Sequence, residues 1–267
     1  MSLSLDDRID LTYQAAQKGA ARAQEFFRQD FRVQTKANKS DLLTVADLTV
    51  QNEIIELLEQ RAPGEPVIGE EGSQPKSLDS GETGWIVDPI DGTNNFVREI
   101  PFWGTAVVSI VEGEPLAAMT AMPSLGDQYN ADREGVYRNN SPIQVSDRDD
   151  PETFAVAPII WWELDNRVEL SRLTDQLVST FGDLRRYWCA QGTLALVAAG
   201  SLEAAVTTVE TNPWDTVGGV YMIRQAGGTV TNADGHRWEP DDTTLVASNG
   251  TQHDVVVESV RNALDSV

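Results

Sequence analysis

Hydrophobic positions near the start of the chain recur with the period of an α-helix. Between residues 4 and 30 apolar side chains return every three or four positions, after a Ser-Leu-Asp-Asp sequence typical of a helix start. The apolar stripe consists of Leu5, Ile9, Ala16, Ala20, Ala23 and Phe27. A second such pattern begins at Thr44 and stops before Pro63. We therefore expect two helices, with Asp47 in the first turn of the second.

Short runs of strand-forming residues follow, separated by turns such as Glu112-Gly113-Glu114. These runs are residues 66–69, 83–87, 105–111, 115–122, 127–131 and 135–138. Consecutive strands joined by short turns indicate an antiparallel meander.

The pattern changes after the polar stretch 146–151, because strands and helices now alternate. Strands are expected at 154–160, 184–188 and 204–209, and helices at 164–180, 193–199 and 214–226. We predict an α+β subdomain over residues 1–147, which carries most of the candidate chemistry, and an α/β subdomain over residues 148–267.

The charge of the chain limits the classes of partner that it can bind. The 267 residues carry a formal net charge of -22, which disfavours nucleic acid and anionic membranes as partners. We interpret the charge mainly as the surface of a halophilic protein, with a functional acidic patch as the alternative. A single cysteine, Cys189, a polar start without signal-peptide features and the lack of a long apolar run predict a cytoplasmic protein.

The most informative segment is Asp88-Pro89-Ile90-Asp91-Gly92-Thr93. A buried strand leads into two aspartates, and Gly92 allows the backbone to approach a ligand. Thr93 is expected to begin a helix, whose free N–H groups attract anions. Carboxylates beside such a helix start suit a complex of Mg²⁺ and phosphate. Asp-x-x-Asp alone would favour an ordinary turn, and the Pro-x-Asp-Gly-Thr context reverses that preference.

Three more acids lie at the ends of expected elements. Glu70 and Glu71 end a short strand, and Asp215 begins a helix, where a plain capping role is the alternative. If the five carboxylates converge, they repel one another unless a divalent metal ion lies between them.

Taken in order, these segments resemble the inositol monophosphatase family, which belongs to the lithium-sensitive phosphatase superfamily together with fructose-1,6-bisphosphatases. The resemblance covers about residues 32–228 and implies a layered α-β-α-β-α fold and a homodimer. The matching segments are Lys36, Asp41, Thr44 and Asp47, then Gly69-Glu70-Glu71, residues 85–96, and Pro213-Trp214-Asp215.

The resemblance also implies a role for each residue. Two or three Mg²⁺ ions would be held by Glu70, Asp88, the Ile90 carbonyl, Asp91 and Asp215. The backbone amides of Gly92 and Thr93 would bind phosphate. Thr93 and Asp47 would activate the attacking water, with Glu71 as helper or alternative, and Lys36 would offset charge near the metals.

Substrate contacts follow the family less closely. Gly192-Thr193 resembles a pair that opens a helix near the substrate hydroxyls. Cys189 and Thr208 stand where the family has arginine and glutamate, so the nearby Arg185, Arg186 and Glu210 are substitutes. For the two arginines, surface ion pairs are the alternative.

The implied activity is hydrolysis of inositol-1-phosphate, of fructose-1,6-bisphosphate, or of both. Histidinol phosphate and 3′-phosphoadenosine 5′-phosphate are alternative substrates. A non-catalytic regulator that binds sugar phosphate or metal, and a structural acidic protein, are the non-enzyme alternatives. Trp161-Trp162 is either an aromatic wall beside the substrate or packing in the core or a dimer.

Overall fold

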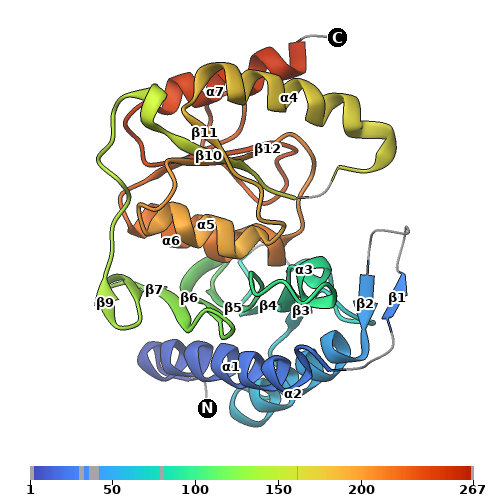
Figure 1. Ribbon diagram of the computed structural model, residues 1–267. Coiled ribbons are helices and arrows are strands. Elements are labelled where there is room, and N and C mark those ends of the chain that lie inside the picture. Colours follow the sequence, from blue (N-terminus) through green and yellow to red (C-terminus); the bar gives the residue numbers. More distant parts are fainter. Residues whose placement is uncertain (1–2, 30–32, 36–41, 79–80, 161, 266–267) are drawn as a thin grey trace.

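The computed structural model describes residues 3–29, 33–35, 42–78, 81–160 and 162–265. Five layers of helices and sheets follow one another (Figure 1). Helices α1 (Leu5–Phe26) and α2 (Val45–Arg61) cover a seven-stranded sheet, and α5 (Ala190–Ala198) and α6 (Pro213–Gln225) separate it from a five-stranded sheet. Helices α4 (Arg167–Thr180) and α7 (His253–Asp265) cover the far side. The predicted α-β-α-β-α layering is confirmed.

The first sheet has the strand order β3-β4-β5-β6-β7-β8-β9. Its strands are β3 (Val67–Gly69), β4 (Gly84–Asp91), β5 (Gly104–Val111), β6 (Glu114–Met122), β7 (Asp127–Asp132), β8 (Gly135–Arg138) and β9 (Ser141–Pro142). Each pair from β4 onwards is antiparallel, as the meander predicted, while β3 is parallel to β4. Strand β4 runs beyond the predicted end to Asp91, with a register shift after Asp88. Both aspartates therefore belong to one strand, which lies next to the edge strand β3.

The second sheet is mixed, with the order β11-β10-β12-β14-β13. Its strands are β10 (Ala155–Pro158), β11 (Asp183–Leu184), β12 (Ala204–Thr207), β13 (Thr229–Thr231) and β14 (Leu245–Ser248). The strand predicted over residues 184–188 is wrong, because β11 ends at Leu184. Trp188 has a φ of 60°, which no strand accommodates. The predicted helix over 193–199 begins three residues earlier, so Gly192 and Thr193 lie within its first turn.

The remaining elements are short. Strands β1 (Val33–Thr35) and β2 (Leu42–Thr44) form a separate antiparallel pair. Helix α3 (Thr93–Val97) follows β4 directly, and single 3₁₀ turns span Pro151–Thr153 and Leu164–Asn166.

Apolar side chains fill the spaces between all layers. Leu11, Ile54, Trp85 and Trp103 are buried between α1, α2 and the first sheet. A second group of buried residues surrounds α5 and α6 and includes side chains from both sheets. Burial of each large apolar side chain stabilises the folded state by about 1.5–3 kcal/mol relative to its exposure to water. Leu5, predicted on the apolar stripe of α1, is instead 44% exposed.

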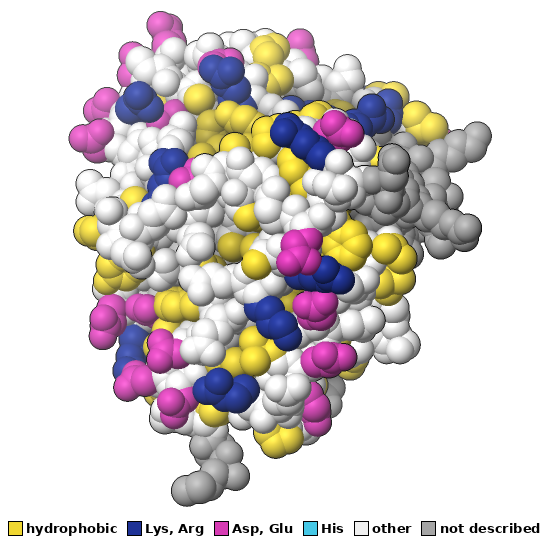
Figure 2. Space-filling view, turned by 60° about the horizontal axis from the view of Figure 1, so that its bottom comes forward, with side chains coloured by type: hydrophobic (Ala, Val, Ile, Leu, Met, Phe, Trp, Pro, Cys, Tyr) yellow, Lys and Arg dark blue, Asp and Glu magenta, His cyan; other side chains and the backbone are white. Residues whose placement is uncertain are grey.

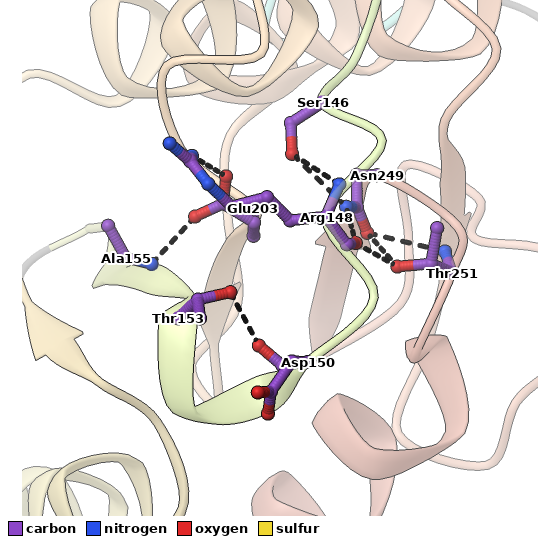
Figure 3. A network of polar contacts seen from close by, with 8 residues as sticks. All are labelled: Ser146, Arg148, Asp150, Thr153, Ala155, Glu203, Asn249 and Thr251. Carbon is purple, nitrogen blue, oxygen red and sulfur yellow. Dashed lines mark hydrogen bonds and ion pairs between the residues drawn. The ribbon is translucent and has the colours of Figure 1, made fainter.

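The segment that joins the two sheets is held by buried Glu203 (Figure 3). Its carboxylate accepts hydrogen bonds of 2.7 Å from the Arg148 side chain and from the Ala155 amide. The Arg148 carbonyl in turn accepts bonds from the side chains of Asn249 and Thr251. A buried carboxylate is stable only when it is paired in this way. The contacts of Glu203 therefore fix the position of the segment that joins the two sheets.

Acidic and basic side chains lie next to one another on the face where α1 and α2 come forward (Figure 2). Arg22 pairs with Glu25 and Glu53, and Arg133 pairs with Asp6. On the described part of this face the acidic excess therefore forms no single patch. Among the described helices, none has an apolar stretch long enough to cross a lipid bilayer.

Candidate metal and phosphate site

Three aspartates from two distant segments converge at the end of β4. Asp88, Asp91 and Asp215 each offer a carboxylate oxygen, and these atoms lie within 4.8 Å of one another. Asp88 is 2% exposed and Asp91 is 5% exposed. Within the described residues, the Asp88 Oδ1 atom is buried without a hydrogen-bond partner. An unpaired buried carboxylate oxygen is costly, so this atom is suited to bind a cation.

The mutual charge of these groups disfavours ionisation. Burial, and then the charges of Glu70, Asp91 and Asp215, raise the pKa of Asp88 well above its ordinary value. Burial, followed by the charges of Glu70 and Asp91, raises the pKa of Asp215 to about 7. Glu70 therefore acts on the same cluster, although it is not one of the three residues whose oxygens lie closest together.

Helix α5 orients the carboxylate of Asp91. Asp91 Oδ1 accepts a bond of 2.9 Å from the Ala190 amide, and Oδ2 accepts bonds from the Cys189 thiol at 2.8 Å and the Gly192 amide at 3.2 Å. Free amides at a helix start favour a negative charge. A Cβ atom on Gly192 would lie 2.7 Å from the Cys189 sulfur, so the close approach requires glycine.

Asp215 lies in the first turn of α6. Its Oδ2 atom accepts bonds from the Asn212 amide at 3.3 Å and from the Asn212 side chain at 3.0 Å. The residue does cap its helix, as the alternative interpretation held. Because both bonds use one oxygen, capping and membership of the acidic cluster are compatible.

Thr93 and Asp47 form a polar pair beside the cluster. The Thr93 hydroxyl lies 3.2 Å from Asp47 Oδ1 and 3.0 Å from the Ile90 carbonyl oxygen, and can donate its proton to either. Asp47 is fully buried in α2. Gly92 has a φ of 88°, and a Cβ there would lie 3.1 Å from the Trp188 carbonyl oxygen. This backbone conformation turns the chain sharply from β4 into α3.

The segment of Glu70 and Glu71 is held through its main chain. Gln51 of α2 accepts a bond from the Glu71 amide and donates one to the Glu71 carbonyl, both 2.8 Å long. Glu71 is 3% exposed. The backbone that carries both glutamates is therefore fixed at the end of β3, next to β4.

The predicted substrate residues are in different settings. Arg185 is exposed and pairs with Asp183, as the surface alternative held. Arg186 lies over two indole rings, 4.6 Å from the centroid of Trp188 and 5.6 Å from that of Trp162. No carboxylate among the described residues forms an ion pair with Arg186.

The other predicted positions to consider are Thr193, Glu210, Lys36, Trp161 and Trp162. The Thr193 hydroxyl donates to the Cys189 carbonyl at 2.6 Å, and Glu210 is exposed. Lys36 lies outside the described residues, as does Trp161. Trp162 is 1% exposed and bonds to Thr208 through its indole nitrogen, which fits packing in the core.

Several contacts were not anticipated from the sequence. They are the bonds of Cys189 to Asp91, of Gln51 to Glu71, of Glu169 to Thr208, and of Lys76 to the carbonyls of Gly69 and Glu70. All but the last join residues far apart in the chain, so no local spacing could have revealed them.

The residues present fit a hard divalent cation. Carboxylate oxygens are the ligands that Mg²⁺ prefers. A bound cation would lower the raised pKa values of these aspartates and would give Asp88 Oδ1 a partner. By its fold and this group of acids, the chain is of the class of layered α/β proteins that hold metal ions with carboxylates.

Comparison with known proteins narrows this class. The profile of the inositol monophosphatase family matches residues 4–265. A fructose-1,6-bisphosphatase/inositol-1-monophosphatase of Thermotoga maritima is 26% identical and is aligned over 98% of both chains. A histidinol-phosphatase of Streptomyces coelicolor is 31% identical, over 88% of this chain and 89% of the relative. The solved structure of a Thermotoga maritima inositol monophosphatase has a TM-score of 0.88 at 26% identity, covering 97% of this chain and 98% of that one.

The chain therefore belongs to the inositol monophosphatase family. Its class is that of the phosphoric monoester hydrolases, and the enzymes of this family depend on metal ions.

Proposed function

We propose that this protein hydrolyses a phosphomonoester of a small polyol or sugar in a Mg²⁺-dependent reaction, with inositol-1-phosphate and fructose-1,6-bisphosphate as leading substrates. The observation that carries the proposal is the convergence of Asp88, Asp91 and Asp215, with one buried oxygen of Asp88 unpaired in the described structure. Glu70 and the Ile90 carbonyl complete the proposed ligand set for two or three Mg²⁺ ions.

Bound Mg²⁺ would supply positive charge that polarises the phosphate and lowers the pKa of the attacking water. The remaining work falls to the chain itself. The amides of Gly92 and Thr93 bind phosphate oxygens at the start of α3. Thr93 Oγ1 accepts the proton of the water while its own proton passes to Asp47 Oδ1, 3.2 Å away. Glu71 assists from the adjacent segment.

Substrate recognition is assigned to the region around the start of α5. Gly192 and Thr193 would shape the substrate site there, since the Thr193 hydroxyl and both backbone amides already donate within the protein. Arg186 is the stronger cationic candidate, because Arg185 has a carboxylate partner. Glu210 is exposed and is therefore accessible to a substrate.

We also propose that the protein is cytoplasmic, halophilic and lithium-sensitive, and that it forms a homodimer. Each subunit would consist of two subdomains divided near residue 148. Its negative charge of -22 supports the halophilic proposal, since high salt screens self-repulsion.

Phosphate release from four substrates tests the function. Inositol-1-phosphate, fructose-1,6-bisphosphate, histidinol phosphate and 3′-phosphoadenosine 5′-phosphate would be compared by kcat/KM with Mg²⁺ at high KCl, with and without Li⁺. Asp88→Asn and Thr93→Ala should each lower kcat by roughly 100-fold or more, because each removes charge or proton transfer from the reacting centre. Asp127→Asn is the control. Asp127 of β7 pairs with Arg138 of β8, so this variant should keep its turnover. Near-normal kcat in Asp88→Asn at saturating Mg²⁺ would refute the proposal.

A further inference from the structure

Lys76 holds together the backbone of the segment that carries Glu70. Its ammonium donates hydrogen bonds of 2.8 Å to the carbonyl oxygens of both Gly69 and Glu70. The chain therefore leaves β3, passes Glu70, and returns six residues later to bind its own main chain. Lys76 is one of only four lysines in the chain.

The same ammonium contacts the segment that carries Asp215. The Lys76 nitrogen lies 5.2 Å from the ring centroid of Trp214, the residue before Asp215 in the first turn of α6. A cation over an indole face is attracted by the negative face of the ring. Trp214 is itself fixed, since it is 7% exposed and its carbonyl accepts a bond of 2.6 Å from Gln191.

The choice of partners is informative in so acidic a protein. No carboxylate among the described residues forms an ion pair with Lys76, although the chain holds 42 acids. Its three contacts are two carbonyls and an aromatic face, which come from the two segments that bring Glu70 and Asp215 to the cluster. The geometry is that of a clip between these segments.

We propose that Lys76 is a positioning residue that holds the Glu70 segment against the start of α6, so that their carboxylates remain close before any metal binds. The inference rests on the proposed function, in which Glu70 and Asp215 are metal ligands. Like charges at one site repel, so without a clip the metal-free protein would open at β3, where the ligand segment lies at the edge of the sheet. Each ion would then have to draw the segments together at the expense of its own affinity.

Mg²⁺ binding to the substrate-free protein, measured by isothermal titration calorimetry, tests this role. Lys76→Met keeps the apolar stem and removes the ammonium, so the dissociation constant for Mg²⁺ should rise about three- to tenfold. Lys76→Arg keeps a donor and a cation and should bind Mg²⁺ nearly as the parent does. Lys18→Met is the matched control. Lys18 also donates to a main-chain carbonyl, that of Glu53 at 2.9 Å, but it belongs to helix α1 and not to the segments of Glu70 and Asp215.

Two further readouts separate positioning from a general loss of structure. The kcat of Lys76→Met at saturating Mg²⁺ should stay within about twofold of the parent, because the bound ions then hold the ligands themselves. Hydrogen exchange in the metal-free protein should increase over residues 69–76 and at the start of α6 in Lys76→Met, and not in Lys18→Met. If Lys76→Met folds poorly, Lys76→Gln gives the same comparison.

The outcomes distinguish this inference from the proposed function. Unchanged Mg²⁺ affinity in Lys76→Met overturns the inference alone. Mg²⁺ binding by the parent without hydrolysis of any of the four substrates overturns the proposed function and leaves the clip standing. A parent protein that binds no Mg²⁺ overturns both.

Discussion

The Cys189 thiol donates a hydrogen bond of 2.8 Å to Asp91 Oδ2, and both residues are almost completely buried. Burial and the adjacent Asp91 charge raise the pKa of the thiol well above its ordinary value, so it stays protonated and remains a donor. The structure gives the thiol a specific role, which is to orient a candidate metal ligand together with two amides of α5.

Cys189→Ala should therefore affect both stability and activity. The variant loses a buried sulfur and one donor to Asp91, which should lower the free energy of unfolding by about 1–2 kcal/mol. It should also lower kcat/KM several-fold at limiting Mg²⁺, because Asp91 becomes less well oriented. Cys189→Ser keeps a donor and should retain most of the activity. Denaturant unfolding and initial rates check both effects, and equal rates in Cys189→Ala and the parent would contradict the orienting role.

The local patterns of the sequence predicted several element boundaries closely, whereas the layered fold was implied by the family resemblance. The 3.6-residue periodicity placed the first two helices, and the capping sequence placed Ser4 correctly, since its side chain accepts a bond from the Asp7 amide. Alternating apolar runs predicted the meander, including the limits of β8. These features depend on neighbours in the chain, which is why a single sequence reveals them.

Long-range contacts could not be predicted in the same way. Cys189 and Asp91 are 98 positions apart, and no residue type signals that they meet. The strand expected over residues 184–188 gave no reason to prefer either Arg185 or Arg186 as a substrate contact. In the structure the strand ends early, Arg185 pairs with Asp183, and Arg186 lies over the rings of two tryptophans. Which arginine could meet a substrate was therefore a question of tertiary packing.

Arg186 gives a prediction about substrate choice. Burial, and then the charge of Arg167, lower the pKa of Arg186, and its guanidinium lies over indole faces without an ion-pair partner among the described residues. Arg186→Gln should raise KM for fructose-1,6-bisphosphate roughly tenfold, because a charged hydrogen bond contributes about 1.5–3 kcal/mol. The KM for inositol-1-phosphate, which has a single phosphate, should change little. Steady-state kinetics with both substrates measure the difference.

Arg185→Gln is the matched control for this comparison. Arg185 is the adjacent residue with the same charge, but it pairs with Asp183 at the surface. Its loss should leave both KM values within about twofold of the parent, as for most exposed ion pairs. If Arg185→Gln and Arg186→Gln raise KM equally, the effect comes from overall charge and Arg186 has no specific contact with the substrate.

His253 gives a prediction about pH and stability. Its ring nitrogens lie 2.8 Å from Ser248 Oγ and 2.9 Å from Thr231 Oγ1, so the ring joins both strands of the β13–β14 pair to the start of α7. Burial lowers its pKa below the ordinary value, an effect that the charge of Asp254 partly opposes. The folded protein therefore binds a proton at His253 less readily than the unfolded chain does.

The sign of the pH effect follows from this difference. Above about pH 6.5, the ordinary pKa of histidine, the ring is neutral in both states and its contribution to stability is complete. As the pH falls below this value the unfolded chain takes up the proton first, so stability decreases until the pH reaches the lower folded pKa. A single group can change the free energy of unfolding by at most about 1.4 kcal/mol per pH unit. Denaturant unfolding of His253→Gln between about pH 5 and 7.5 should lack this component. His236→Gln, at an exposed histidine, should keep it. Parallel stability profiles for the parent and His253→Gln would exclude His253 as the source.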